Sequence, residues 1–406
     1  MMNSMPDELA PFRDRVLADR QLCDLLCSET EWDSFSDTLL RESKDACCRL
    51  SEQDLLPLRE RSALLDRSGL LTPPVRPTTE VELLEGWVPL RVSWRGGAPI
   101  VCWYRMGNTR FTAPFFTHTA LACIQRPFNT LFHQETSIEM VGKYVDRWPG
   151  RQPDGIVYHT SRCGSTLVTQ MLAALPTVTV LSEPDPVDTL LDYRRHNPEI
   201  RDEQAAIWIR WIVEAIARPG PAGQGGLVIK TDSWHILMFD VLRAAFPNTP
   251  WIFLHRNPVE VLVSLRRMAG RRAMPGAVDP ALLGITLFEA CTMTQDRYCA
   301  WLLTCICRAA LDHLEHGGLP VNYNSLPDAA LNLLPEYFGL VITDAERSAM
   351  RAVSARDAKQ PSIKFSPDGA VKRIEAIDEI RSLAAAWLDP LYERLDEIAA
   401  QRTSLQ

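Results

Sequence analysis

The chain of 406 residues is long enough for two or three domains and has a globular composition, with 46% hydrophobic and 23% charged residues. A net charge of −8 argues against a protein that coats nucleic acid, so any phosphate site must be local. No apolar run approaches the ~18 residues that span a bilayer, and the N-terminus MMNSMPDELAPFRDR lacks a signal pattern. We therefore expect a cytoplasmic protein that does not bind membranes. Its eleven cysteines form no paired C-x-x-C set with partner histidines, which favours reduced structural thiols.

Residues 1–150 predict an extension of helices and a β-hairpin. Helical patterns cover residues 7–66, and Ser51 with Asp54 indicates the start of the last helix, which Gly69 would end. A proline-rich joint follows at 72–77. The alternation in WVPLRVSW, the turn RGG and the return PIVCWY predict a hairpin over 87–104. The aromatic segment FTAPFFTHTALACIQRPFNTLFHQ shapes an acceptor site or a dimer contact, or it caps the next domain, which is the interpretation we favour.

From residue 151 to 406 the pattern changes to short apolar strands alternating with helices. This alternation predicts an α/β fold with a parallel sheet flanked by helices. The expected strands are 155–160, 177–183, 226–232, 249–256 and 319–325. The expected helices are 165–175, 201–217, 235–246, 258–270, 280–315 and 327–337.

Polar residues follow four of these strands. They are the turn 160–166, Glu183, Lys230 and Arg256. Ligands of parallel sheets bind beyond the carboxyl ends of the strands, so we expect these residues to form one site on one rim.

The turn Thr160-Ser161-Arg162-Cys163-Gly164-Ser165-Thr166 predicts a phosphate-binding loop. A helix N-terminus offers unpaired N–H groups and a positive dipole end. Gly164 permits close backbone approach, Ser165 and Thr166 add hydroxyl donors, and Arg162 adds a forked cation. No GK[ST] occurs in the chain, which disfavours ATP hydrolysis with Mg²⁺. The alternative is an ordinary strand–turn–helix connection.

A second motif, Arg256-Asn257-Pro258, follows another buried strand. Pro258 suits the first turn of a helix, and Ser264 lies eight residues after Arg256. Both side chains can face one anion above the sheet. Alternatively, Arg256 pairs with a carboxylate and Ser264 packs within its helix.

Together, these motifs resemble the sulfotransferases that use 3′-phosphoadenosine 5′-phosphosulfate (PAPS), over residues 155–373. In that family the first loop binds the 5′-phosphosulfate and the Arg…Ser pair binds the 3′-phosphate. The loop arginine, Lys230 26 residues before Arg256, and Glu183 21 residues after Arg162 are most similar to the tyrosylprotein-type branch. The resemblance implies that the donor-binding residues are Arg162, Cys163, Gly164, Ser165, Thr166, Arg256, Ser264, Tyr323 and Lys372, with Arg373 as an alternative to Lys372.

Sulfuryl transfer needs a base for the acceptor and cations for the leaving group. Glu183 is the base that we favour, because a partly desolvated carboxylate would have a raised pKa. Pro184 and Pro186 are expected to keep its segment from becoming helical. Asp232 and His235 are alternative bases, whereas His159 is expected to be structural. Lys230 and Arg162 would stabilise the leaving group, and the chemistry requires no divalent metal.

We therefore predict a PAPS-dependent sulfotransferase that forms 3′,5′-ADP and sulfates a hydroxyl, or an amine, of a small molecule or peptide. The alternatives are an atypical P-loop phosphotransferase or kinase and a non-catalytic nucleotide-binding module. The arginines at 266, 267, 271 and 272 suit an anionic acceptor or, as we favour, lie at a solvated helix end. The identity of the acceptor and the oligomeric state, including a homodimer, stay open.

Overall fold

The chain divides into two compact units. The computed structural model describes residues 9–45, 50–64, 78–217 and 225–403, so the predicted stop at Gly69 and the joint 72–77 lie outside the described residues. The first unit contains Met1–Arg151, Asp185–Tyr193 and Ile207–Pro219, and the second contains Gln152–Pro184, Arg194–Ala206 and Gly220–Gln406. Two later segments thus belong to the first unit. A single boundary at residue 150 therefore does not separate the two units completely.

The first unit combines helices with a three-stranded antiparallel sheet, ordered β1-β2-β3. The expected hairpin is confirmed, with Gly96 and Gly97 at φ values of 60° and 80° in its turn. The strand β3 was not predicted, because QETS is short and polar. The elements are α1 (Leu9–Ala18), α2 (Arg20–Ser28), α3 (Trp32–Asp45), α4 (Glu52–Leu64), β1 (Val88–Arg95), β2 (Ala98–Tyr104), α5 (Phe116–Ile124), α6 (Pro127–Phe132), β3 (Gln134–Ser137) and α7 (Ile138–Arg147).

The predicted start of α4 is confirmed by the contacts between Ser51 and Asp54. The backbone N–H and the hydroxyl of Ser51 both donate to Oδ2 of Asp54, at 2.9 and 2.6 Å. These bonds fix the chain where α4 begins.

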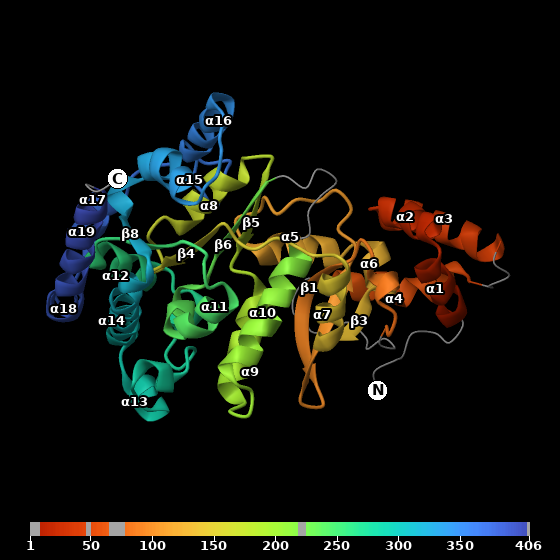
Figure 1. The fold of residues 1–406 in the computed structure, drawn as a ribbon, viewed down its shortest axis with the longest axis horizontal. Helices are drawn as coiled ribbons and strands as arrows, with labels where there is room; N and C mark the ends of the chain where they lie inside the picture. Colours follow the sequence, from red (N-terminus) through yellow and green to blue (C-terminus); the bar gives the residue numbers. More distant parts are fainter. Residues whose placement is uncertain (1–8, 46–49, 65–77, 218–224, 404–406) are drawn as a thin grey trace. The chain divides into compact units, whose positions relative to one another are not determined.

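The second unit contains a parallel five-stranded sheet, ordered β5-β6-β4-β7-β8 (Figure 1). All five expected strands are present, and the predicted α/β fold is confirmed. Because the strands are parallel, their carboxyl ends lie at one rim of the sheet. The strand order changes direction at β4, and ligands of such sheets bind at this point of the rim. The strands are β4 (Gly155–His159), β5 (Val178–Ser182), β6 (Gly226–Lys230), β7 (Trp251–His255) and β8 (Gly318–Asn322).

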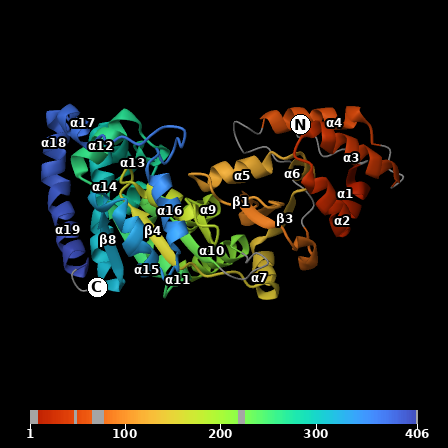
Figure 2. The same cartoon turned by 90° about the horizontal axis from the view of Figure 1, so that it is seen from above.

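Helices cover both faces of this sheet. Val157, Ile252 and Leu319 share a buried core with Val168 of α8 (Ser165–Ala173). On the opposite face Tyr158 and Trp251 contact Phe239 of α11 (Phe239–Ala245). The C-terminal helices pack along α12 (Pro258–Arg267) and α14 (Gln295–His313) (Figure 2). The remaining helices are α9 (Asp185–His196), α10 (Asp202–Ile216), α13 (Leu287–Thr292), α15 (Leu334–Tyr337), α16 (Asp344–Ser354), α17 (Gly369–Glu375), α18 (Asp378–Leu383) and α19 (Asp389–Thr403).

Two helix predictions were wrong. Helix α9 begins at Asp185 although Pro184 and Pro186 were expected to prevent a helix. Proline is tolerated there because first-turn N–H groups have no intrahelical acceptor. The expected helix 280–315 is instead a 3₁₀ turn (Pro280–Leu283), α13 and α14. Gly284, at φ 64°, ends the turn, and hydrogen bonds from Thr286 and Thr294 start the two helices separately.

No helix within the described parts of the chain has the length and apolar character to cross a membrane.

Candidate active site

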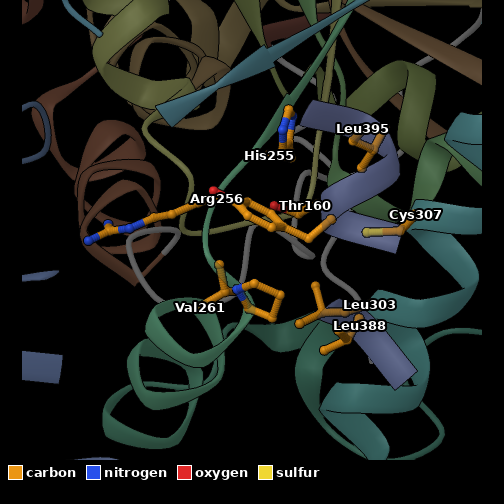
Figure 3. A pocket seen from close by; sticks show the side chains of 10 residues that line it. Thr160, His255, Arg256, Val261, Leu303, Cys307, Leu388 and Leu395 are labelled. Atoms are coloured by element: carbon orange, nitrogen blue, oxygen red, sulfur yellow. The ribbon is translucent and has the colours of Figure 1, made fainter. Parts of the chain in front are cut away.

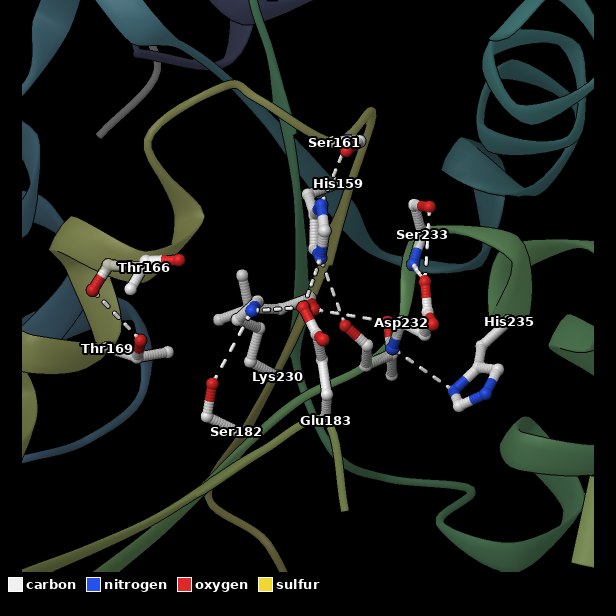
Figure 4. A network of polar contacts seen from close by, with 12 residues as sticks. His159, Ser161, Thr166, Thr169, Ser182, Glu183, Lys230, Asp232, Ser233 and His235 are labelled. Carbon is white, nitrogen blue, oxygen red and sulfur yellow. Dashed lines mark hydrogen bonds and ion pairs between the residues drawn. The ribbon is translucent and has the colours of Figure 1, made fainter. Parts of the chain in front are cut away.

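The polar segments after β4, β5, β6 and β7 meet at one rim of the parallel sheet. Nζ of Lys230 lies 2.5 Å from Oε1 of Glu183. Nη1 of Arg256 lies 3.4 Å from the carbonyl oxygen of Arg162. Residues that are 94 positions apart in the chain are thus brought together as predicted. Figure 4 shows Lys230, Glu183 and His159 converging between the strand ends.

Backbone strain is concentrated at this rim. Within the described ranges the non-glycine residues with positive φ are Ser161 (67°), Arg162 (50°) and Glu183 (55°). Such conformations cost on the order of 1–3 kcal/mol each and cluster at binding and catalytic sites. All three are residues of the predicted site or its loop. These strained residues make the rim a candidate functional site.

A glycine shapes the turn before α8. Gly164 has φ 84° and precedes α8, and as a glycine it has no side chain that could cap the first N–H groups of this helix. A Cβ at Gly164 would lie 2.9 Å from both Cδ2 of Tyr323 and Cδ1 of Leu326. Only glycine therefore fits between the turn and Tyr323.

The other loop side chains are largely buried. Ser165 and Thr166 are 5% and 6% exposed. Cys163 lies in the hydrophobic core, and burial raises the pKa of its thiol. Of the predicted binding residues, Cys163 can therefore reach a ligand only through its backbone.

The side chain of Arg162 extends to the end of α12. Its Nη2 donates to the carbonyl oxygen of Met268 at 2.5 Å. Burial lowers the pKa of Arg162. This bond ties the phosphate-binding turn to the helix that follows Arg256.

His159 holds the turn in place. Its Nδ1 accepts a hydrogen bond from the backbone N–H of Ser161 at 2.9 Å, and its Nε2 lies 3.0 Å from the carbonyl oxygen of Thr231. These contacts require a neutral ring protonated on Nε2. Burial lowers the pKa of His159 to about 3, and the charge of Lys230 acts in the same direction. His159 thus has the structural role that the sequence suggested, because it connects the backbone of Ser161 to that of Thr231.

Glu183 and Lys230 form a tight ion pair. The side chain of Lys230 is 1% exposed and that of Glu183 is 29% exposed. Burial raises the pKa of Glu183, but the charges of Lys230 and His159 and the hydrogen bond from Lys230 lower it, and the net pKa lies below the usual value. The expected raised pKa is therefore wrong for this state, because the sequence could not show that Lys230 lies beside the carboxylate.

The alternative bases Asp232 and His235 cap a 3₁₀ helix (Ser233–Met238). Oδ1 of Asp232 accepts from the N–H of Ser233 at 2.6 Å, and Nδ1 of His235 accepts from the N–H of Asp232 at 3.3 Å. Oδ2 of Asp232 also lies 3.8 Å from Nε of Arg272. These contacts give both residues a structural task.

A second cluster surrounds Arg256, which is 7% exposed. Its Nε donates to Oε2 of Glu260 at 2.8 Å and its Nη2 donates to Oδ1 of Asp368 at 3.1 Å. Its guanidinium carbon lies 4.0 Å from the centre of the Tyr323 ring. Nζ of Lys372 lies 2.8 Å from Oδ2 of Asp368. Tyr323 and Lys372 are thus brought to Arg256, as expected.

Two carboxylates at this cluster, Glu260 and Asp368, were missed by the sequence analysis. Arg373 pairs with Glu260, whose other oxygen faces Arg256. The pairing of Arg256 with carboxylates is the arrangement that the sequence left as an alternative. Ser264 lies further along α12 and is half-buried.

A small apolar pocket adjoins this cluster. Arg256 contributes to its wall, but the guanidinium points away from its apolar residues, as Figure 3 shows. His255 lies at the other end, with Nε2 2.8 Å from Oδ1 of Asp396. The pocket is lined by Thr160, His255, Arg256, Pro258, Val261, Leu303, Cys307, Leu388, Tyr392 and Leu395. Its apolar lining gives it no role in binding phosphate.

The arginines near the end of α12 are engaged in separate contacts. Arg266 pairs with Asp296 at 2.6 Å, Arg267 pairs with Glu375, and Arg272 lies over the Trp234 ring at 5.0 Å. Arg266 and Arg267 are half-exposed, as the favoured interpretation of a solvated helix end expects, whereas Arg272 is largely buried.

The chain matches one family model and is similar to several solved structures. Residues 157–298 match the model of the "Sulfotransferase family". No curated protein matches the chain. Sulfotransferase STF9 from Mycobacterium avium has 15% identity and a TM-score of 0.39, covering 62% of this chain and 81% of its own.

Two further solved structures are similar. The sulfotransferase domain from the curacin biosynthetic pathway has 18% identity and a TM-score of 0.35, covering 63% of this chain and 98% of its own. Mouse sulfotransferase SULT7A1 complexed with PAP has 15% identity and a TM-score of 0.32, covering 64% of this chain and 87% of its own. The segment matched by the family model contains the phosphate-binding turn, Glu183, Lys230 and Arg256. The match to the sulfotransferase family model thus lies in residues 157–298.

Proposed function

We propose that this protein transfers the sulfuryl group of PAPS to a hydroxyl acceptor. The observation that supports the proposal is that two groups of possible anion-binding donors lie on one rim of the sheet. The uncapped N-terminus of α8 lies on one side, and Arg256 with Lys372 lies on the other. Two such loci suit a nucleotide that carries phosphate at both its 3′ and 5′ positions.

The donor would be held by groups from both loci. The N–H groups of Ser165 and Thr166 point out of the first turn of α8 toward its 5′-phosphosulfate. Arg256 and Lys372, with Ser264, bind its 3′-phosphate. The Tyr323 ring, in contact with Gly164 and Arg256, lies between the loci and offers a face to the nucleoside.

PAPS supplies an activated sulfuryl group, and the chain supplies charge and a base. Glu183 takes the proton of the acceptor hydroxyl while the acceptor oxygen forms a bond to sulfur. The bond from sulfur to the phosphate oxygen breaks, and Lys230 with Arg162 stabilises the charge that collects on that oxygen. Positioning and charge stabilisation are enough for this step, so no divalent metal is needed.

The Glu183–Lys230 pair couples donor binding to the base. When Lys230 turns to the donor, Glu183 loses the cation that holds its pKa down. Burial then dominates and raises the pKa of Glu183 toward that of a useful general base. The base is thus kept charged and inactive in the free protein and becomes effective beside bound donor.

The acceptor is proposed only by class, as a hydroxyl of a small molecule or peptide. The arginines near α12 have other partners, so they give no reason to expect an anionic acceptor. An ATP-dependent phosphotransferase is not favoured, because the chain lacks the GK[ST] of that chemistry. A non-catalytic module does not explain a buried Glu–Lys pair beside the phosphate-binding turn.

Titration calorimetry without magnesium tests the proposal. Wild type is expected to bind 3′,5′-ADP more tightly than 5′-AMP or ATP, and Arg256→Ala is expected to lose that preference. Lys230→Ala should keep binding but lower the rate of PAPS-dependent sulfation by roughly 10²–10³-fold, the usual effect of removing one group that stabilises charge in the transition state. Equal or tighter binding of ATP would contradict the proposal.

A further inference from the structure

Asp368 contacts Arg256 and Lys372, the two cations that are proposed to bind the 3′-phosphate. Its two oxygens contact different cations, with Oδ1 3.1 Å from Nη2 of Arg256 and Oδ2 2.8 Å from Nζ of Lys372. Burial raises the pKa of Asp368, but hydrogen bonds from Lys372 and Arg256 outweigh it and lower the pKa. Asp368 is therefore an anion that bridges the two groups.

The contact with Lys372 is an i,i+4 pair at the start of α17, whereas the contact with Arg256 joins residues 112 positions apart. Asp368 directly precedes α17, in the position of a capping residue, yet its side chain makes no capping hydrogen bond. It is also 45% exposed, whereas the side chains of Arg256 and Lys372 are 7% and 6% exposed. A half-exposed carboxylate thus reaches two buried cations from the solvent side.

Glu260 differs from Asp368 in this respect. It is buried in the first turn of α12 and is bonded to Arg256 and Arg373. A Cβ at Gly369 would lie 2.8 Å from its oxygens, so α17 packs closely against this carboxylate. Glu260 is a fixed part of the cluster, and Asp368 is the anion that an entering ligand can displace.

A phosphate and the Asp368 carboxylate need the same hydrogen-bond donors. Arg256 presents Nη2, and Lys372 presents its ammonium, to whichever anion lies between them. A phosphate dianion carries more charge and more acceptor oxygens than a carboxylate, so it can displace Asp368. Because the contacts of Asp368 must first be broken, the net affinity for the phosphate is lowered. A nucleotide without 3′-phosphate does not compete for these donors.

We propose that Asp368 is an internal competitor of the 3′-phosphate, which weakens the binding of 3′-phosphorylated nucleotides and speeds the release of 3′,5′-ADP. The inference rests on the proposed function. It assigns to Asp368 a task that is separate from chemistry, since Asp368 returns to Arg256 and Lys372 when the product leaves.

The test compares Asp368→Asn with Glu375→Gln. Asn has the shape of Asp without its charge, and no capping bond is lost. Glu375 lies on the same helix and, among the residues that the structure describes, pairs with the exposed Arg267, so it controls for loss of one negative charge nearby. Calorimetry with 3′,5′-ADP and 5′-AMP gives the affinities, and stopped-flow displacement gives the release rate of 3′,5′-ADP.

Asp368→Asn is expected to bind 3′,5′-ADP about tenfold more tightly, as for loss of one competing charge-assisted contact, and to release it more slowly. Its affinity for 5′-AMP should stay unchanged, and Glu375→Gln should match wild type for both nucleotides. Unchanged or weaker binding of 3′,5′-ADP by both Asp368→Asn and Asp368→Ser would overturn the inference, because Asp368 would then only hold the cations in position. A wild type without preference for 3′,5′-ADP would instead reject the proposed function.

Discussion

Glu183 shows how neighbouring residues set the chemistry of a single carboxylate. It is partly buried, has a left-handed backbone with φ 55°, and is paired with a lysine that is almost completely buried. Desolvation and the lysine charge act on its pKa in opposite directions. Because the lysine effect prevails, the folded protein keeps this carboxylate charged at neutral pH.

The depressed pKa of Glu183 predicts a pH-dependent contribution to stability. The contribution is present above the unfolded pKa of about 4.3 and is lost as pH falls through the lower folded pKa. Glu183→Gln should therefore lower the free energy of unfolding by about 3 kcal/mol at pH 7, the usual result of breaking a buried pair. The difference from wild type should shrink as the pH falls below about 4.

Denaturant unfolding at several pH values measures this difference. Glu397→Gln is the control, because Glu397 and Arg394 form a pair in which both side chains are exposed and which contributes little. A difference between wild type and Glu183→Gln that is independent of pH would contradict the ion pair.

His159 allows its two hydrogen bonds to be tested separately. Asn places an acceptor near the position of Nδ1, whereas Gln places a donor near the position of Nε2. His159→Asn should keep the bond from Ser161 and bind 3′,5′-ADP nearly as wild type does. His159→Gln should lose that bond and bind about tenfold more weakly, since one lost hydrogen bond costs about 1 kcal/mol or more. Equal losses in both variants would mean that His159 acts only through packing.

At the scale of elements, the turn into α8 depends on its glycine. Gly164→Ala would place a Cβ 2.9 Å from Tyr323 at a φ of 84°. We expect a loss of about 1–3 kcal/mol in the free energy of unfolding and weaker binding of 3′,5′-ADP. Gly270→Ala is the matched control, because a Cβ there has no neighbour within 4 Å. Thermal unfolding and calorimetry check both variants, and a Gly164→Ala protein with wild-type affinity would contradict the proposed loop.

The strands of the parallel sheet were predictable because each is a short apolar run followed by a polar residue. The same regularity placed the turn at 160–166, Lys230 and Arg256 on one rim. Helix α9 was missed because prolines were treated as helix breakers without regard to the first turn. The break between α13 and α14 was missed although Thr286, Glu289 and Thr294 are capping residues.

Contacts over long separations could not be predicted in the same way. Asp368 lies 112 residues from Arg256, and no pattern near either residue indicates the pair. The bond from His159 to Thr231 spans 72 residues. Sequence patterns are local, whereas the charge around Arg256 and the pKa of Glu183 depend on which loops the sheet order brings together. The positions of the site residues could therefore be predicted from the sequence, whereas their ion pairs and pKa shifts could not.

At the scale of the whole molecule, the proposed donor site belongs entirely to the second compact unit. Stability changes confined to the first unit should therefore leave nucleotide affinity unchanged. Trp103→Phe removes the 2.8 Å bond from the indole N–H to Oγ1 of Thr136 in a fully buried site. We expect about 1–3 kcal/mol less free energy of unfolding, measured by denaturant, and wild-type affinity for 3′,5′-ADP. A parallel loss of affinity would show that the site depends on the first unit.

One rim of the sheet is proposed to bind both phosphates of a 3′,5′-bisphosphorylated nucleotide. A crystal structure with 3′,5′-ADP tests this claim most directly. We predict the 5′-phosphate at the first turn of α8 beside Lys230, and the 3′-phosphate between Arg256 and Lys372 with Asp368 displaced. A nucleotide bound elsewhere, or one whose 3′-phosphate does not contact Arg256, would contradict the account.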